Sequence, residues 1–146
     1  LEFKSTLRVN LHTKEFDKKI EYAALKSLCA FLNSEGGILL IGVNNNGETL
    51  GINKDNFSNI DSFLLHLTNL IKDKLGKKSL KSISVEPVKI KDKLIIKINC
   101  KKSDSRIFLK SQSNEEEFYI RAGPSSTELK GNELIDYIKK RFEKKE

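Results

Sequence analysis

Methionine is absent from this 146-residue chain, even at position 1. Because a natural translation start normally leaves a methionine nearby, we expect residues upstream of Leu1 to belong to a longer parent protein. No run of about eighteen apolar residues is present, so we expect no membrane span. The chain also lacks a charged segment followed by an apolar one, so we expect no secretion signal and a cytoplasmic location.

Cysteine and histidine are too sparse to predict a disulfide framework or a zinc site. Cys29 and Cys100 stand singly in apolar stretches, which is typical of buried free thiols in a reducing compartment. The only histidines are His12 and His66, and no CxxC pair exists, which argues against zinc. A GxxxxGK[ST] phosphate loop is also absent. With 38% hydrophobic residues, the chain can bury a core without such supports.

The net charge of +7 is concentrated in one segment. Residues 72–110 contain 13 basic and 4 acidic residues, whereas the segments before and after each have a net charge of −1. A polyanion such as nucleic acid is the natural partner of such a segment. The alternative is a lysine-rich protein in which these side chains only solvate exposed strands and helices.

Hydrophobic periodicity predicts an α+β fold. Apolar residues at three- and four-residue spacing predict helices at residues 16–32, 61–75 and 132–142. Strands are predicted at residues 1–7, 38–43, 48–52, 83–90, 94–100, 107–110 and 118–121. We therefore expect one domain over residues 1–146, with a mixed, mostly antiparallel sheet packed against about three helices. The lysine-rich end after Phe142 is expected to fray.

Three strand predictions are more specific. The continuous apolar run Ile38–Val43 predicts a central strand buried on both faces, followed by an Asn-Gly hairpin turn. In the strand Leu94–Cys100, the even-numbered residues are expected to be buried, and the face of Ile95 and Lys97 to be exposed. Residues 107–110 and 118–121 are expected to form a hairpin together.

The first stretch that suggests chemistry is Leu1-Glu2-Phe3-Lys4-Ser5. On a strand, Glu2 and Lys4 share one face, while Leu1 and Phe3 are expected to point into the core. A carboxylate and a lysine placed in this way recur in metal-dependent nucleases, where they bind a divalent cation and stabilise negative charge on the phosphate. The alternative is an ordinary surface ion pair.

A second stretch, from Ala30 to Gly47, combines a helix end, a Gly-Gly turn, an apolar strand and an Asn-Gly turn. Gly42 within the strand predicts the close approach of a neighbouring backbone. A third stretch, from Phe118 to Leu129, contains Tyr119 and Arg121 before a Gly-Pro turn. Arg121 could bind phosphate and Tyr119 could stack on a base; the alternative is a core aromatic and a salt-bridged arginine.

In this order and spacing, the three stretches resemble the Schlafen-type AlbA-like family, from Leu1 to about Phe142. That family has a glutamate-phenylalanine-lysine-serine opening, a centre running from alanine-phenylalanine-x-asparagine through glycine-glycine to isoleucine-glycine-valine, and a tyrosine-x-arginine-x-glycine-x-serine end. The resemblance implies a DNA-binding or ATP-binding domain of a bacterial-type regulator or defence protein. Some members cleave transfer RNA and ribosomal RNA with a metal held by three acidic residues.

The resemblance transfers only part of that acidic site. Glu2 matches one metal ligand and Lys4 the lysine beside it, and a second glutamate would lie upstream of Leu1. The third ligand, an aspartate in the family, corresponds to Asn45, which binds Mg²⁺ or Mn²⁺ less well because its amide is uncharged. The resemblance therefore implies Glu2, Lys4 and Asn45 as catalytic residues, with Glu2 and Asn45 as metal ligands, and leaves nuclease activity open.

Three functions follow. The first is a nucleic-acid-binding domain for RNA or DNA, with these binding residues: Lys4, Lys77, Lys78, Lys81, Lys97, Lys101, Lys102, Tyr119, Arg121 and Ser125. The second is a metal-dependent endoribonuclease acting on tRNA-like structured RNA. The third is an ATP-binding or dimerising regulatory scaffold. The family resemblance also implies a homodimer or a second AlbA-like lobe, beside other domains of the parent protein, as partners.

Overall fold

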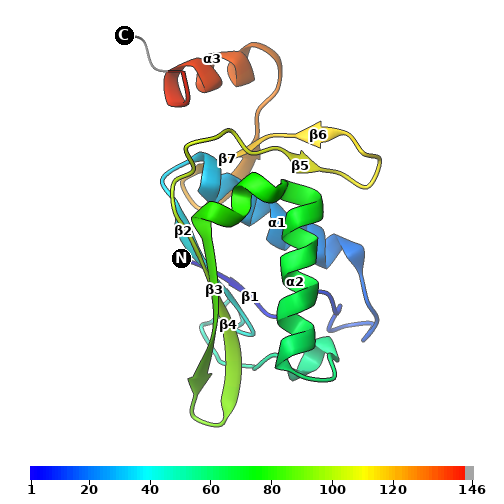
Figure 1. Ribbon diagram of the computed structural model, residues 1–146. Helices are drawn as coiled ribbons and strands as arrows, with labels where there is room; N and C mark the ends of the chain where they lie inside the picture. The colour runs from blue at the N-terminus through cyan, green and yellow to red at the C-terminus, as the bar shows by residue number, and fades with distance from the viewer. Residues whose placement is uncertain (144–146) are drawn as a thin grey trace.

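A computed structural model describes residues 1–143 of the chain. Its centre is a four-stranded sheet in the order β1–β2–β4–β3 (Figure 1). The strands are β1 (Glu2–Lys4), β2 (Gly37–Ile41), β3 (Ile83–Ile90) and β4 (Lys93–Cys100). Strand β1 runs parallel to β2, and the other two pairings are antiparallel. The predicted α+β fold with a mixed, mostly antiparallel sheet is confirmed.

Two helices, α1 (Lys18–Asn33) and α2 (Ile60–Leu75), cover one face of this sheet (Figure 1). Helix α1 begins after Asp17, whose carboxylate accepts a hydrogen bond from the Lys19 backbone N–H. Helix α2 begins in the same way after Asn59 and ends at Gly76, where φ is 85°. Both helices match the predicted ranges within two residues. In the described part of the chain, none of the helices has the length and apolar character needed to cross a lipid bilayer.

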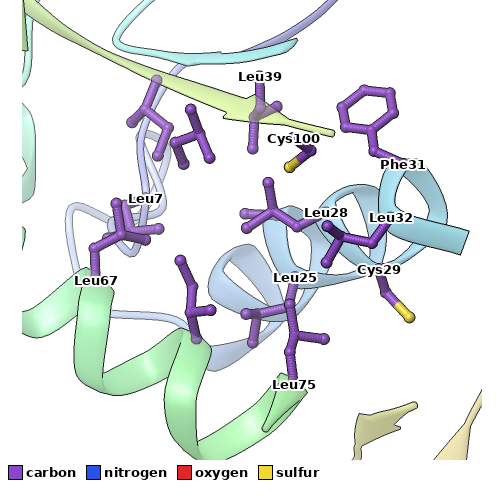
Figure 2. Packing of buried hydrophobic residues seen from close by; sticks show 14 of the residues in the cluster. Leu7, Leu25, Leu28, Cys29, Phe31, Leu32, Leu39, Leu67, Leu75 and Cys100 are labelled. Carbon is purple, nitrogen blue, oxygen red and sulfur yellow. The ribbon is translucent and has the colours of Figure 1, made fainter. Parts of the chain in front are cut away.

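The core lies between the sheet and these helices. Figure 2 shows Leu25 and Leu28 of α1 and Leu67 of α2 packed into one cluster with Leu39 of β2. These side chains are at most 2% exposed. Burying one leucine contributes about 1.5–3 kcal/mol, so this cluster holds the sheet and helices together.

Two small hairpins and a third helix, α3 (Gly131–Arg141), complete the described chain. The first hairpin pairs β5 (Leu109–Lys110) with β6 (Glu116–Glu117), and the second pairs β7 (Tyr119–Ala122) with β8 (Ser125–Glu128). Residues 118–121 therefore do not pair with 107–110 as predicted. The Gly-Pro turn brings the following residues back along β7 instead, because a tight turn favours pairing of adjacent segments.

Asn33 at the end of α1 fixes the position of β7. Its side-chain amide donates to the backbone oxygens of Ile107 at 2.8 Å and Tyr119 at 3.0 Å, and accepts from the Ile107 N–H at 2.9 Å. Its backbone carbonyl accepts from Tyr137 at 2.6 Å and from Arg141 at 3.1 Å. One buried asparagine therefore joins α1 to the β5 region, β7 and α3.

Two glycines in the stretch from Ala30 to Gly47 allow close contacts between backbone segments. Gly42 has a φ of 98°, and a Cβ there would lie 3.1 Å from the backbone of Gly51. Gly36 has a φ of 83°, and a Cβ there would lie 2.5 Å from the carbonyl oxygen of Cys100. The predicted close approach of a neighbouring backbone at Gly42 is confirmed.

Several strand predictions are corrected. Strand β2 is not buried on both faces, because helices cover one side only and Ile38 and Leu40 stay half-buried. The expected return strand 48–52 is reduced to one bridge between Val43 and Thr49, because the Gly42–Gly51 crossing diverts it. Strand β1 covers only residues 2–4 of the predicted 1–7, since residues 7–9 donate to the Asp55 carboxylate instead.

Side-chain burial also differs at three positions. In β4, Leu94 is 37% exposed and Ile95 only 2%, so the predicted alternation holds only from Ile96 onward. In α3, Ile135 is 51% exposed although it belongs to the apolar pattern that predicts the helix at 132–142, because only one narrow side of this helix packs against the rest of the protein. The expected fraying beyond Phe142 concerns residues 144–146, which lie outside the described residues.

Candidate functional site

Glu2 is the centre of a charged cluster at the edge of the sheet. Its Oε1 accepts a hydrogen bond from Arg121 Nη1 at 2.6 Å, and its Oε2 accepts from Ser27 Oγ at 2.5 Å. Lys4 Nζ lies 3.3 Å from the same Oε2. Burial opposes the charge on Glu2, but the hydrogen bond from Ser27 and the charges of Lys4 and Arg121 outweigh it and lower the pKa of the Glu2 carboxyl.

The cluster combines residues of β1, α1 and β7, and β1 provides Glu2 and Lys4. Glu2 and Lys4 lie opposite the buried residues Leu39 and Ile41 of β2 and therefore point to the helix-covered side of the sheet. The expectation that both share one face is confirmed. The expectation that Leu1 and Phe3 point into the core is wrong: Leu1 is 72% exposed, and Phe3 lies opposite Leu40 on the other side.

Arg121 reaches the cluster from β7. Its backbone N–H donates to Ser34 Oγ at 2.9 Å, and its guanidinium carbon lies 4.9 Å from the centre of the Phe31 ring. Ser126, across the hairpin, accepts from Arg121 Nη1 at 3.4 Å. The guanidinium is therefore held in place from α1, β1 and β8, with 17% of the side chain exposed.

Residues 1–143 do not by themselves bring together the ligands of a Mg²⁺ or Mn²⁺ site. Both Glu2 oxygens already accept from cationic or hydroxyl donors, which a metal ion would have to displace. Asn45 is exposed and lines a hollow of about 320 Å³ together with Lys4, but Glu2 does not line that hollow. Among residues 1–143, no three His, Cys, Asp or Glu side chains gather closely enough to bind a metal.

A strongly basic groove lies at the C-terminal end of α2. It runs between this helix end, the 3-10 helix η2 (Lys77–Ser82) and the segment leading into β5, with a volume of about 650 Å³. The groove is lined by six basic side chains and only two acidic ones. The basic residues are Lys72, Lys74, Lys77, Lys78, Arg106 and Lys110. We call this hollow the basic groove.

In the structure, the basic residues of segment 72–110 lie on separate parts of the surface. Lys89, Lys91 and Lys93 lie at the tip of the β3–β4 hairpin, at the opposite end of the sheet from η2 (Figure 1). The segment therefore does not form one continuous surface beside Lys4 and Arg121. A long antiparallel hairpin separates residues that are close in sequence, since its tip lies far from its base.

The other predicted binding lysines are more dispersed. Lys97 lies on the open face of the sheet, 3.9 Å from Glu86, and Lys102 lies 3.3 Å from Glu35. Lys81 and Lys101 are exposed. Exposed ion pairs of this kind are weak and readily exchanged for other partners. These lysines could therefore still contact a polyanion, although none of them lines the basic groove.

Tyr119 does not offer a stacking surface. The residue is 7% exposed, and its hydroxyl donates to Glu117 Oε1 at 3.0 Å. Burial and the Glu117 carboxylate both raise the pKa of Tyr119. The expected base stacking is corrected accordingly, because Tyr119 contributes to the core, and the suggested alternative of a core aromatic fits. Ser125 is exposed at the start of β8.

Sequence reasoning missed part of the basic groove. Lys72, Lys74, Arg106 and Lys110 were counted in the basic segment but not selected as binding residues. The signal for two of them is the position of Lys72 and Lys74 in the last turn of a predicted helix, directly before Gly76 and the next lysine pair. No sequence signal indicates that Arg106 and Lys110 return to the same place.

The chain matches a sequence family described as Schlafen, AlbA_2 over residues 1–130. The DIP2311 protein from Corynebacterium diphtheriae has a similar structure, with a TM-score of 0.64 and 15% identity over 97% of this chain. The chain spans 24% of that protein, and at this identity the likeness concerns the fold. The N-terminal domain of a RecG-related protein from Nitrosomonas europaea matches with 16% identity over 85% of this chain and 82% of that one, at a TM-score of 0.48. No curated protein matches in sequence.

Proposed function

This chain belongs to the Schlafen AlbA_2 family, and we propose that it is a nucleic-acid-binding domain whose main phosphate contacts lie in the basic groove. The observation that carries the proposal is the gathering of six basic side chains from α2, η2 and the β5 region around one hollow. Lysine and arginine from separate segments at one place are suited to successive phosphates of one strand.

The charge balance of the groove supports this function. Asp73 and Glu116 are the two acidic residues that line it, so the local charge is strongly positive. Such a concave basic surface concentrates polyanions and accelerates their association. Binding should therefore weaken steeply with salt, because each neutralised phosphate releases counterions.

A metal-dependent nuclease is not part of this proposal. Within the described residues, Ser27 and Arg121 donate hydrogen bonds to the two carboxylate oxygens of Glu2. A divalent cation would have to compete with these donors for the Glu2 carboxylate.

The test is a salt titration of binding to a fluorescein-labelled RNA stem-loop, followed by fluorescence anisotropy. The variant Lys77→Gln/Lys78→Gln removes two charges from the groove, and the matched control Lys89→Gln/Lys91→Gln removes two charges from the hairpin tip. We expect the groove variant to bind more weakly and to reduce the salt slope by about 1 per lysine. The control should keep nearly the affinity and slope of the wild type. Salt-independent binding, or equal loss in both variants, would contradict the proposal.

A further inference from the structure

Two further hollows lie next to the basic groove along α1. The first, of about 540 Å³, lies between α1 and the loop joining β5 to β6, and Tyr22 and Gln112 line it. The second hollow has a volume of about 280 Å³ and is also lined by Tyr22 and Gln112, together with Lys74 and Lys110. Since Lys74 and Lys110 also line the basic groove, the three hollows are neighbours that share lining residues, and we call this row of hollows the channel.

The two ends of this channel differ in charge. The basic groove has six basic and two acidic lining residues, whereas the far hollow has Lys19 and Lys26 balanced by Glu115 and Glu117. Phosphates are favoured at the first end. At the other end, the carboxylates disfavour phosphates but can accept hydrogen bonds from the amino groups of bases.

Tyr22 supplies an aromatic surface at the balanced end. The residue is partly exposed, in contrast to the buried Tyr119. Lys26 Nζ lies 5.5 Å from the centre of the Tyr22 ring, so a cation is within reach of a phosphate next to a stacked base. A tyrosine in a groove, flanked by lysines, is the arrangement with which proteins bind unpaired nucleotides.

The size of the channel points to a single strand. The hollows of about 540 and 650 Å³ have the volume of small-molecule sites, and the third, of about 280 Å³, is slightly smaller. These sizes suit individual nucleotides. The bases of a duplex are paired and stacked and cannot reach such hollows without being pulled out, which costs free energy.

We propose that this channel binds single-stranded nucleic acid, with phosphates in the basic groove and a base stacked on Tyr22. This inference rests on the proposed nucleic-acid-binding function and adds its preferred form and a specificity-determining residue. Gln112, whose amide can both donate and accept, lies at the junction where a base edge would be contacted.

The experiment compares a labelled oligouridylate with the duplex formed by the same strand and its complement. The variant Tyr22→Leu keeps an apolar side chain against the core but removes the aromatic ring, and Tyr22→Phe is the matched control that retains it. We expect Tyr22→Leu to bind the single strand about 5- to 100-fold more weakly and to leave duplex binding unchanged. Tyr22→Phe should keep the wild-type affinity.

A second variant gives a direct signal. The chain contains no tryptophan, so Tyr22→Trp introduces a single indole at the proposed stacking position. We expect saturable quenching of its fluorescence by the oligouridylate. Absence of quenching, or equal affinity of Tyr22→Leu and wild type for the single strand, would overturn this inference while leaving salt-sensitive binding in the basic groove intact. Failure of the wild type to bind either nucleic acid would overturn the proposed function as well.

Discussion

Arg121 donates a hydrogen bond of 2.6 Å to Glu2, although the two residues are 119 positions apart in the sequence. The pair joins the first strand of the sheet to the hairpin of β7 and β8. The contact places a guanidinium of the same chain on the carboxylate that the family resemblance implies as a metal ligand. In this structure Glu2 is therefore a structural anchor.

The first prediction concerns the stability that this anchor provides. Glu2→Gln keeps the shape of the side chain but removes its charge, and both partners are less than one quarter exposed. Because hydrogen bonds to charged groups contribute about 1.5–3 kcal/mol, we expect the free energy of unfolding to fall by that amount. Urea denaturation followed by circular dichroism measures the change.

The matched control for this variant is Glu35→Gln. Glu35 pairs with Lys102 at 3.3 Å but its side chain is 84% exposed, so its loss should change stability by less than about 1 kcal/mol. Adding Mn²⁺ should leave the melting temperature of the wild-type protein unchanged. A Mn²⁺-dependent rise in wild type that disappears in Glu2→Gln would instead establish a metal site at Glu2.

The second prediction is the pH dependence of the same contribution. The pKa of Glu2 is lower in the folded protein than its ordinary value of 4.5, so folding favours the charged carboxylate. Its stabilising effect should be complete above pH 4.5 and should disappear as the pH falls through the folded-state pKa. Urea titrations of wild type and Glu2→Gln should therefore differ most near neutral pH and converge in acid. A difference that stayed constant through that range would contradict the role of the charge.

The third prediction concerns Asn33. Replacing it with alanine leaves the buried carbonyl oxygens of Ile107 and Tyr119 without their amide donor. Because each unsatisfied buried group costs about 1–3 kcal/mol, we expect a loss of at least about 2 kcal/mol in the free energy of unfolding. Asn132→Ala, at an exposed position of α3, is the control and should change it little. Equal effects of the two variants would show that Asn33 is not a special anchor.

The fourth prediction concerns thiol reactivity. Burial raises the pKa of Cys29 and of Cys100 to about 12, so both thiols stay protonated at physiological pH. We expect slow labelling by a thiol reagent in the native protein and rapid labelling of both residues in urea. Rapid labelling of the native protein at neutral pH would contradict this assignment.

Much of the fold could be predicted from local patterns. The helices α1 and α2 follow from apolar residues at helical spacing, with Asp17 and Asn59 as caps and Gly76 as an end signal. The hairpin of β3 and β4 follows from two apolar segments around a short polar turn. These elements depend on neighbouring residues along the chain, which is why one sequence is enough to indicate them.

The candidate site was predicted only in part, and for a physical reason. The sequence was enough to identify the basic segment and to select Glu2, Lys4 and Arg121 as candidate site residues. Their contacts could not, because the amide hydrogen bonds of Asn33 place β7 beside α1. Through that placement, Arg121 reaches Glu2.

By itself, the sequence determined the α+β class, the three helices α1, α2 and α3, the excess of positive charge and the family. Only the tertiary structure decided where that charge gathers. The β3–β4 hairpin takes Lys89 and Lys91 to its far tip, whereas Arg106 and Lys110 return to the end of α2. Side chains distant in sequence meet according to long-range packing and pairing, and the hydrophobic pattern of one segment carries no information about where another segment will lie.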